Sequence, residues 1–533
     1  MAVDNIYDAG VAGGWKVRDA LTFDKNITLE ADIVIVGTGA GGGTAAELLT
    51  QAGFKVLMLE EGALKTSSNF KDMDESRAYK ELYQEAAGRA TSDGAIAILQ
   101  GRAVGGTTVV NWTASFRTPD HTLKHWADVH AVKGHSPEEM APWFAKMEQR
   151  LNIAPWAMPP NPNNQVLHDA CAKLGWEWHV IPRNVKGCWN SGYCGLGCPV
   201  NAKQSMLVST IPSALAGGAE LVHHLRVETL QFTNNEITGL TGLALDKNCR
   251  NPTGIQVTVK AKHYILAGGA INTPALLLRS KVPDPNERIG KRTCIHPVVL
   301  TLAQMPQEIN PFYGAPQSIA SDFFQWKDGA TGKMGYKLEV PPVFPAIASG
   351  ILGNFDNGLR DDMAMLPHTN AMLALMRDGF VEDSQGGQVK IDDKGMAMLD
   401  YDISDFIWDG AKRAYLSMAE AQFASGAQKV RPAHLDGKWT SSWNEAKNQI
   451  EHLKYKKFRT ALFTAHLMGG CTMGEDAKTS VVNSQGQHHQ FSNLSIFDGS
   501  VFPTSLGVNP QLSIYGLVAQ NATALVTKLG AKV

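Results

Sequence analysis

Residues 31–42 read ADIVIVGTGAGG, and this stretch decides the fold expected for the chain of 533 residues. Residues 31–36 alternate in character and are rich in β-branched side chains, which predicts a strand. Residues 44–52 predict a helix packed behind the glycine turn, and residues 55–59 predict a second strand. This order of elements predicts a βαβ unit that opens an α/β domain.

The glycine turn has the spacing of a dinucleotide-binding fingerprint, Gly37-x-Gly39-x-x-Gly42. The first glycine makes a tight turn, the second lets the backbone approach a pyrophosphate, and the third permits close packing of helix on strand. Glu60 lies 23 residues after Gly37, where an acidic side chain accepts hydrogen bonds from ribose hydroxyls. The alternative for Glu60 is a solvated side chain beside Glu61. The fingerprint by itself does not distinguish NAD from FAD.

Two later segments, residues 262–270 and 494–498, have the pattern of further strands of the same domain. A domain assembled from separated segments implies that another domain is inserted between them. We predict the following division: a cofactor-binding domain over residues 28–300 and 456–533, with a cap and cysteine-loop insertion at 112–200, and a substrate domain over 301–455.

The predicted substrate domain carries three local signals. Residues 387–391 and 397–401 predict a hairpin joined by an Asp-Asp-Lys-Gly turn, and a helix is expected from near Ser404 to near Gly426. The stretch 363–376 is rich in methionine and leucine. It could line a channel for an aliphatic chain or a quinone, or it could be ordinary core.

Charge and hydropathy limit the classes of partner. The formal net charge is −2, so no basic field attracts nucleic acid or an anionic membrane over long range. The first residues lack the basic and apolar regions of a signal peptide, and no apolar run of about 18 residues could span a bilayer. We expect a cytoplasmic chain with no transmembrane span. Peripheral membrane association, or export only with a partner subunit, stays open.

A second glycine-rich segment, residues 101–111, reads GRAVGGTTVVN. Its hydroxyl groups and amide could line an elongated cofactor, which favours FAD. With this segment in place, the chain resembles the glucose-methanol-choline family of FAD-dependent oxidoreductases over nearly its full length. The matching segments follow the family's order: residues 37–42, 59–62, 101–111, 268–277, 296–297, 466–474 and 498–510.

The resemblance implies a Rossmann-type FAD-binding domain built from separated segments, and a substrate domain with an antiparallel sheet and helices. Of the residues it points to, Gly105, Gly106, Thr107 and Asn111 would lie along the flavin, Val227 would meet the adenine, and Asp498 would contact the cofactor. The expected FAD-binding residues are Gly37, Gly39, Gly42, Glu60, Arg102, Gly105, Gly106, Thr107, Asn111, Val227 and Asp498. One departure is that residues 279–282 read RSKV where the family often has SGIG, so the flavin edge is expected to differ there.

His466 and Asn509 are the expected catalytic residues. The resemblance places a histidine at the His466 motif beside the flavin, where it would accept the hydroxyl proton of the substrate while hydride moves to flavin N5. An ordinary pKa of about 6.5 suits a general base, and such bases contribute roughly 10²- to 10⁴-fold in rate. Asn509 matches a second position that orients the alkoxide oxygen. The alternatives are a buried core histidine and a turn before Pro510.

Three of the seven cysteines, Cys188, Cys194 and Cys198, lie within eleven residues. Their spacing is similar to that in catalytic subunits of FAD-dependent glucose dehydrogenases, where three cysteines could ligate an iron-sulfur cluster. The continuation over residues 201–206 is more similar to long-chain alcohol oxidases and dehydrogenases, in which the thiols would be structural. Both interpretations stay open. Cys471 is expected to be a packing residue.

The predicted activity is oxidation of an alcohol, more often aliphatic or long-chain than a sugar, to an aldehyde or ketone. The electron acceptor could be a quinone, a cytochrome or oxygen. One alternative is a sugar dehydrogenase subunit that passes electrons through an iron-sulfur cluster. Alternatives of other classes are a flavin-dependent lyase or photoenzyme on the same fold and a protein that only binds its ligand.

Overall fold

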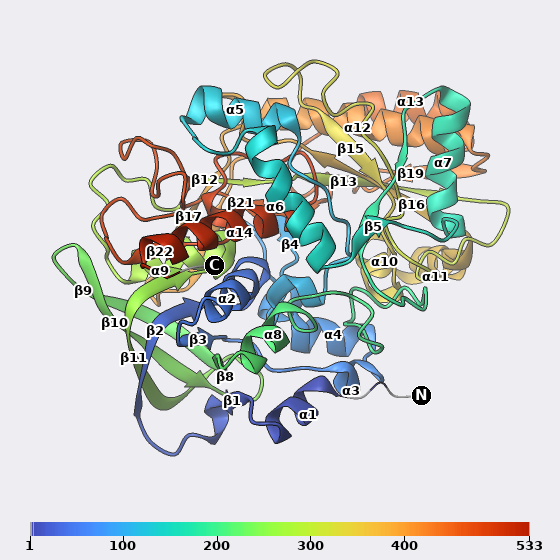
Figure 1. Cartoon of the computed structure of the whole chain (residues 1–533). Helices are drawn as coiled ribbons and strands as arrows, with labels where there is room; N and C mark the ends of the chain where they lie inside the picture. Colours follow the sequence, from blue (N-terminus) through green and yellow to red (C-terminus); the bar gives the residue numbers. More distant parts are fainter. Residues whose placement is uncertain (1–2, 4, 532–533) are drawn as a thin grey trace.

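The computed structural model describes residue 3 and residues 5–531, and it contains two large sheets that the chain crosses between several times (Figure 1). The first sheet has eight strands in the order β1–β8–β3–β2–β11–β10–β9, with β22 beside β11. Within it, α2 (Ala40–Gln51) connects two parallel neighbours, β2 (Ile27–Val36) and β3 (Val56–Leu59), so the predicted βαβ unit is confirmed. The other strands are β1 (Lys16–Asp19), β8 (Glu220–His223), β9 (Leu225–Thr233), β10 (Glu236–Leu245), β11 (Pro252–Leu266) and β22 (Leu494–Ile496).

The C-terminal part of the chain returns to this sheet, as the sequence predicts. β22 pairs in parallel with the end of β11, and the Phe497 N–H donates to the Leu266 carbonyl at 2.8 Å. The predicted helix start at residue 44 is wrong, because α2 begins at Ala40 and its glycines form the first helical turn rather than a loop. A glycine is needed at position 41, because a Cβ there would lie 1.6 Å from the Phe497 carbonyl oxygen.

The second large sheet also has eight strands, ordered β4–β20–β13–β16–β15–β14–β6 with β19 beside β13. Its central pairs are antiparallel, and α12 (Asp405–Ala424) packs on β13 and β16, which confirms the predicted antiparallel sheet with helices. The strands are β4 (Ile96–Ile98), β6 (His179–Val180), β13 (Val298–Gln304), β14 (Ile319–Ser321), β15 (Tyr336–Glu339), β16 (Thr369–Met376), β19 (Lys429–Pro432) and β20 (Leu462–Thr464). Since β4, β6 and β20 lie outside 301–455, this sheet draws on three segments of the chain beyond the predicted substrate domain. The division of the chain at 301 and 455 stays a prediction.

The predicted hairpin is present but belongs to a smaller sheet. β17 (Gly387–Ile391) and β18 (Ala397–Asp400) pair antiparallel around the expected turn. They continue into β12 (Lys291–Ile295) and β21 (Leu467–Met468), giving a four-stranded sheet. β21 starts directly after His466, so this small sheet fixes the backbone of the histidine motif.

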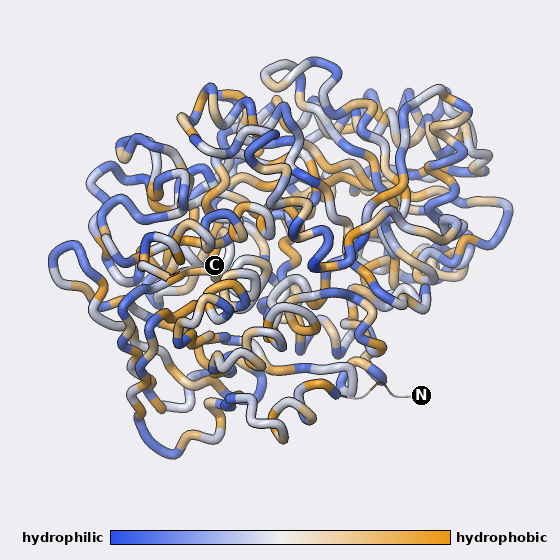
Figure 2. The backbone as a smooth tube through the Cα atoms, viewed as in Figure 1, coloured by the Kyte–Doolittle hydropathy of each residue, from blue (hydrophilic) through white to orange (hydrophobic). Residues whose placement is uncertain are grey.

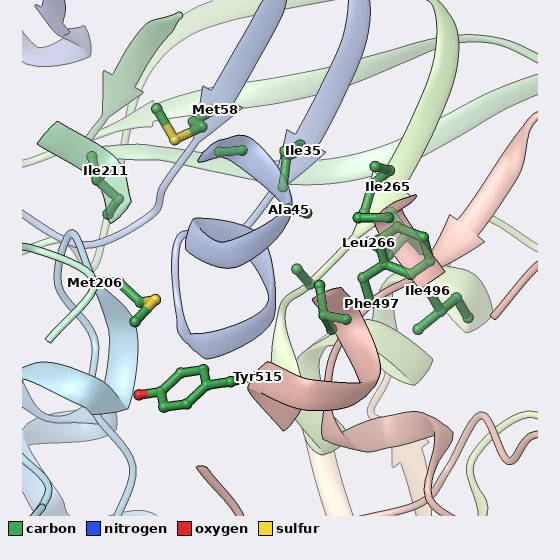
Figure 3. Packing of buried hydrophobic residues seen from close by; sticks show 14 of the residues in the cluster. Ile35, Ala45, Met58, Met206, Ile211, Ile265, Leu266, Ile496, Phe497 and Tyr515 are labelled. Atoms are coloured by element: carbon green, nitrogen blue, oxygen red, sulfur yellow. The ribbon is translucent and has the colours of Figure 1, made fainter. Parts of the chain in front are cut away.

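Along the backbone, hydrophobic residues concentrate in the interior of the molecule, while many of the outer loops are hydrophilic (Figure 2). In the largest core, Ile35, Ile265 and Ile496 come from three neighbouring strands, and Ala45 and Tyr515 come from the two helices that cover them (Figure 3). α14 (Gln511–Lys528), the helix of Tyr515, packs on α2 and on α6 (Pro137–Arg150). In the part of the chain that the structure describes, no helix is both long enough and apolar enough to cross a bilayer.

The Met-rich stretch divides between two environments. On β16, Leu373 and Leu375 line the cavity described below, whereas Met372 and Met376 face the opposite way into the core under α12. Successive strand residues point to opposite faces, which explains the division. The methionines at these two positions are therefore core residues, and leucines take the place at the cavity.

The other elements cover the sheets and join them. α9 (Gly269–Arg279) follows β11 directly, and β5 (Ile153–Pro155) pairs with β7 (Pro182–Asn184) as a separate ribbon. The remaining helices are α1 (Ile6–Ala12), α3 (Ser67–Phe70), α4 (Glu75–Leu82), α5 (Asp120–His130), α7 (Pro162–Leu174), α8 (Thr210–Ala216), α10 (Pro345–Leu352), α11 (Asp356–Ala364) and α13 (Trp443–His452). Short 3-10 turns are η1 (Ala20–Thr22), η2 (Gln84–Ala87), η3 (Gly106–Val109), η4 (Leu366–His368) and η5 (Gly499–Val501).

The contact between α2 and the C-terminal segment gives a prediction for stability. Gly41→Ala places a methyl group against the Phe497 backbone, and overpacking of this kind destabilises by about 2 kcal/mol or more. We expect a lower urea midpoint of unfolding and weaker retention of flavin. Gly350→Ala in α10 is the matched control, since no atom lies within 4 Å of its added Cβ. Equal midpoints for the two variants would contradict the prediction.

Candidate active site

A cavity of about 600 Å³ is lined by residues of both large sheets. It brings together eleven of the thirteen residues predicted for the cofactor or for catalysis: Gly37, Gly39, Glu60, Arg102, Gly106, Thr107, Asn111, Val227, His466, Asp498 and Asn509. Gly42 and Gly105 lie behind the lining. A Cβ at Gly42 would be 1.9 Å from the Gly37 carbonyl oxygen, and the Gly105 N–H donates to Thr38 Oγ1 at 2.9 Å.

The two glycine-rich segments meet backbone to backbone at this cavity. A Cβ at Gly106 would lie 2.7 Å from the Gly39 Cα, so a side chain at this position would close the approach. Gly39 is also the N-cap of α2, and no side chain caps that helix. Open backbone beside an uncapped helix N-terminus is the arrangement that accepts a pyrophosphate, so the residues present fit a dinucleotide such as FAD.

Glu60 is buried, with both oxygens hydrogen-bonded. Oε2 accepts from the Thr38 N–H at 3.0 Å and from Thr38 Oγ1 at 2.6 Å, and Oε1 accepts from the Gly62 N–H at 2.9 Å. Burial raises the pKa of the Glu60 carboxyl to about 7 against these hydrogen bonds. Glu60 is therefore not a solvated surface residue. Its contact with a ribose stays a prediction.

Asp498 holds the loop after β11 in place. It is buried, and its Oδ2 accepts from the Gly269 N–H at 2.8 Å and from Thr273 Oγ1 at 2.7 Å. Burial raises the pKa of Asp498, while the hydrogen bonds from Ser500, Thr273 and Gly269 oppose the rise. The carboxyl thus positions Gly268 and Gly269, which line the cavity.

The other predicted cofactor residues are held by local bonds. The Arg102 guanidinium donates to the carbonyls of Cys249 and Asn248, Thr107 Oγ1 accepts from the Gly101 N–H, and Asn111 Nδ2 donates to Gln511 Oε1. Arg279, in the stretch that departs from the family pattern, donates from its guanidinium to the carbonyls of Val227 and Glu228. The expected difference at the flavin edge stays a prediction.

His466, in the cavity lining, is paired with a second histidine, the buried His296. Their Nδ1 atoms lie 3.0 Å apart, and the Gly507 N–H donates to His296 Nε2 at 3.0 Å. Burial lowers the pKa of His466 to about 4, and burial together with His466 lowers that of His296, so both rings are neutral at pH 7. A neutral His296 that accepts at Nε2 must carry its proton on Nδ1. It donates this proton to His466 Nδ1, which leaves the His466 proton on Nε2.

Asn509 is held from behind by a buried carboxyl. Its Nδ2 donates to Glu339 Oε2 at 3.3 Å, and Gln317 Nε2 donates to the same oxygen at 2.5 Å. Burial raises the pKa of Glu339 to about 7, although Lys337 on the same strand opposes the rise. Asn509 Oδ1 is buried without a partner among the described residues. An amide oxygen of this kind can accept a hydroxyl hydrogen from a ligand.

Sequence reasoning did not identify Glu339, Gln317 or the role of His296. A signal existed for Glu339, because Lys337 and Glu339 are charged residues two apart in the otherwise apolar strand 336–340. Two charges on one face of a buried strand indicate a polar site. His296 and His466 each lie in a recognised motif, but nothing in the sequence indicates that the two side chains are in contact.

The three cysteines of the loop do not line the cavity. Within the described residues, their sulfur atoms do not form a set lying within 4.8 Å of one another. The loop is tied to the predicted flavin-lining segment by Lys203, a buried residue whose Nζ donates to the carbonyls of Val109, Asn111 and Cys194. Burial lowers the pKa of Lys203 to about 8.

The histidine pair gives a prediction for the proton positions. In the protein labelled with ¹⁵N-histidine, we expect the nitrogen chemical shifts of His466 to indicate a neutral ring protonated at Nε2, and those of His296 a neutral ring protonated at Nδ1. His296→Asn should shift the His466 signals, and the exposed His452→Asn should not. A His466 ring protonated only at Nδ1 would contradict the assignment.

Comparison with known proteins agrees with this geometry. The GMC oxidoreductase family matches residues 79–298 with its N-terminal region and residues 383–517 with its C-terminal region. The long-chain-alcohol oxidase FAO4B of Arabidopsis thaliana is 28% identical over 512 residues, covering 92% of this chain and 66% of that protein. The uncharacterized GMC-type oxidoreductase y4nJ of Sinorhizobium fredii is 27% identical and covers 96% of this chain and 97% of its own. The chain spans about two thirds of the length of the plant oxidases that it matches.

Solved structures share the fold at lower identity. Pyridoxine 4-oxidase from Mesorbium loti superposes with a TM-score of 0.67 at 17% identity, covering 92% of this chain and 98% of that one. Formate oxidase gives a TM-score of 0.66 at 14% identity, with 94% and 99% covered. The matched regions, the glycine-lined cavity and the shared fold together show that this chain belongs to the GMC family of FAD-dependent oxidoreductases.

Proposed function

We propose that this protein oxidises aliphatic, preferably long-chain, primary alcohols to aldehydes. The observation that carries the proposal is the apolar wall opposite the cofactor residues. Val298, Leu373, Leu375 and Phe463 line the cavity from the second sheet, in the same cavity as His466 and Asn509. A hydroxyl held by polar groups next to an apolar wall suits an alcohol with a hydrocarbon chain.

The apolar wall continues beyond the cavity. Val298, Leu300 and Leu302 on β13 and Leu373 and Leu375 on β16 form one buried cluster, which also includes residues of α10. A sugar would leave several hydroxyl groups unpaired against such a wall, which disfavours it. The similarity to plant long-chain-alcohol oxidases supports the same substrate class.

His466 and Asn509 would hold the alcohol oxygen from two sides. At rest, His466 Nε2–H donates a hydrogen bond to that oxygen, and Asn509 Oδ1 accepts the hydroxyl hydrogen. For His466 to take the hydroxyl proton at Nε2, its own proton must first move to Nδ1, towards His296. With a proton on His466 Nδ1, His296 would have to move its own proton from Nδ1 to Nε2, the atom that accepts from the Gly507 N–H. The hydrogen bond from Gly507 therefore opposes the move. FAD, when bound, supplies the hydride acceptor.

The preference for long chains can be measured directly. Each methylene group buried against the wall contributes about 0.8 kcal/mol, which corresponds to about a fourfold rise in kcat/KM per added carbon over the medium-chain alcohols. Leu373→Asn should flatten this dependence. Met372→Leu, on the opposite face of the same strand, should leave it unchanged. A preference for glucose, or no dependence on chain length in the native protein, would contradict the proposal.

The low pKa of His466 gives a prediction for the pH profile. Because the active form requires a neutral ring, kcat/KM should fall as the pH drops through about 4 and not near 6.5. The profile is measured for the native protein and for Glu339→Gln, so that an inflection near pH 7 can be assigned to Glu339. A single inflection near pH 6.5 in both proteins would show that His466 is not shifted.

The sugar dehydrogenase alternative rests on the cysteine loop. Lys203 and Arg183 are both buried beside it, and Arg183 Nη2 contacts Cys194 Sγ at 3.6 Å. Two buried cations beside the loop would balance the negative charge of a cluster ligated by cysteine thiolates. An iron assay on purified protein separates the two candidates: iron near three or four atoms per chain supports the cluster, and absence of iron supports structural thiols. Retention of flavin with no reduction by any alcohol would instead favour a lyase or photoenzyme.

A further inference from the structure

A group of potential metal ligands lies at the end of β8, outside both the cavity and the cysteine loop. His224 Nδ1 is 2.8 Å from Asp19 Oδ1, His223 Nδ1 is 3.0 Å from His224 Nδ1, and His223 Nδ1 is 3.8 Å from Asp19 Oδ1. Across the described part of the chain, this is the one set of three His, Cys, Asp or Glu residues whose ligand atoms all lie within 4.8 Å of one another.

The backbone brings these side chains to one point. β1 runs parallel to β8, and Asp19 lies opposite His223 in the register. Consecutive strand residues normally point to opposite faces. His224 has a φ of +55°, and this left-handed conformation breaks the alternation, so both imidazoles reach the same carboxylate. Both histidines are buried, while the Asp19 side chain is 33% exposed and open to solvent on one side.

No placement of the hydrogen atoms gives both short contacts of His224 Nδ1 a good hydrogen bond. If His224 Nδ1–H donates to Asp19, the same hydrogen cannot also point at His223. If both Nδ1 atoms carry protons, the two N–H groups face each other at 3.0 Å. One of the two short contacts is therefore always left without a good hydrogen bond.

We propose that Asp19, His223 and His224 bind a divalent transition-metal ion, with Zn²⁺ as the best match. The three ligand atoms lie on a circle of radius about 1.9 Å, so an ion slightly out of their plane is about 2.0–2.1 Å from each of them. Two imidazole nitrogens and one carboxylate oxygen are ligands that Zn²⁺ accepts. The exposed side of Asp19 leaves the fourth position to water.

The ion would tie the N-terminal strand to the turn between β8 and β9. That turn borders the cofactor cavity, because the His224 N–H donates to the Gly62 carbonyl at 3.3 Å and the Leu225 N–H donates to the Glu60 carbonyl at 2.9 Å. None of the three ligands lines the cavity. The ion is therefore structural, and it is independent of the proposed alcohol oxidation.

The test uses the flavin-loaded protein, dialysed against a chelator and then titrated with Zn²⁺ by calorimetry, with zinc content measured afterwards. We expect one zinc ion per chain. Asp19→Asn keeps the hydrogen bond from the Leu21 N–H, at 3.0 Å in the native protein, but removes the charge. It should weaken Zn²⁺ binding at least about 100-fold, as should His223→Gln. Retention of flavin and the circular dichroism spectrum show that each variant is folded.

The matched control is His168→Gln. His168 Nδ1 also lies 2.9 Å from a carboxylate oxygen, that of Asp169, but no third ligand is present there among the described residues. This variant should bind Zn²⁺ like the native protein. The proposal is overturned if the native protein binds no zinc at one ion per chain. It is equally overturned if Asp19→Asn and His223→Gln bind zinc normally, since the ion would then lie elsewhere, for example at the cysteine loop.

Discussion

The close contact between the Phe497 carbonyl and Gly41 is the constraint on which the rest of the structure depends. A Cβ at position 41 would lie 1.6 Å from that oxygen. The C-terminal segment can therefore reach the first sheet only because the first turn of α2 has a glycine at this position. The same segment carries Asp498 and Asn509, and β22 fixes its register against β11. Because of this contact, residues hundreds of positions apart in the sequence line one cavity.

Two buried polar pairs then set the chemistry of the cavity, one from each side. His296 holds His466 through their Nδ1 atoms, and Glu339 holds Asn509 from the second sheet. Buried polar groups are costly unless they are hydrogen-bonded, so each pair keeps its ring or amide in one orientation. The polar atoms left over, His466 Nε2 and Asn509 Oδ1, are those available to a ligand. The second sheet carries Glu339, which orients Asn509, and it also carries the apolar wall, so this sheet contributes to both orientation and substrate preference.

Local signals in the sequence were sufficient to predict several separate elements of the fold and most of the residues that line the cavity. The fingerprint, the hairpin at 387–400 and the helix after Ser404 depend on short-range spacing, and all three are present. The sequence could not indicate that β4, β6 and β20 join the second sheet, because strand pairing over long separations leaves no local mark. The sequence leaves the stretch 363–376 open between cavity lining and core, since composition does not say which face of a strand meets the cavity. It also missed the partners of His466 and Asn509, which exist only after folding.

The most direct test of the account is anaerobic mixing of the flavin-loaded protein with a long-chain primary alcohol, and with the same alcohol deuterated at its hydroxyl-bearing carbon, while the flavin absorbance is followed. The account predicts that the flavin is bleached and that deuterium slows the bleaching severalfold, because the bond to that hydrogen breaks in the step observed. A flavin that stays oxidised with every alcohol would contradict it, and would show that the two sheets do not meet around an alcohol-oxidising site.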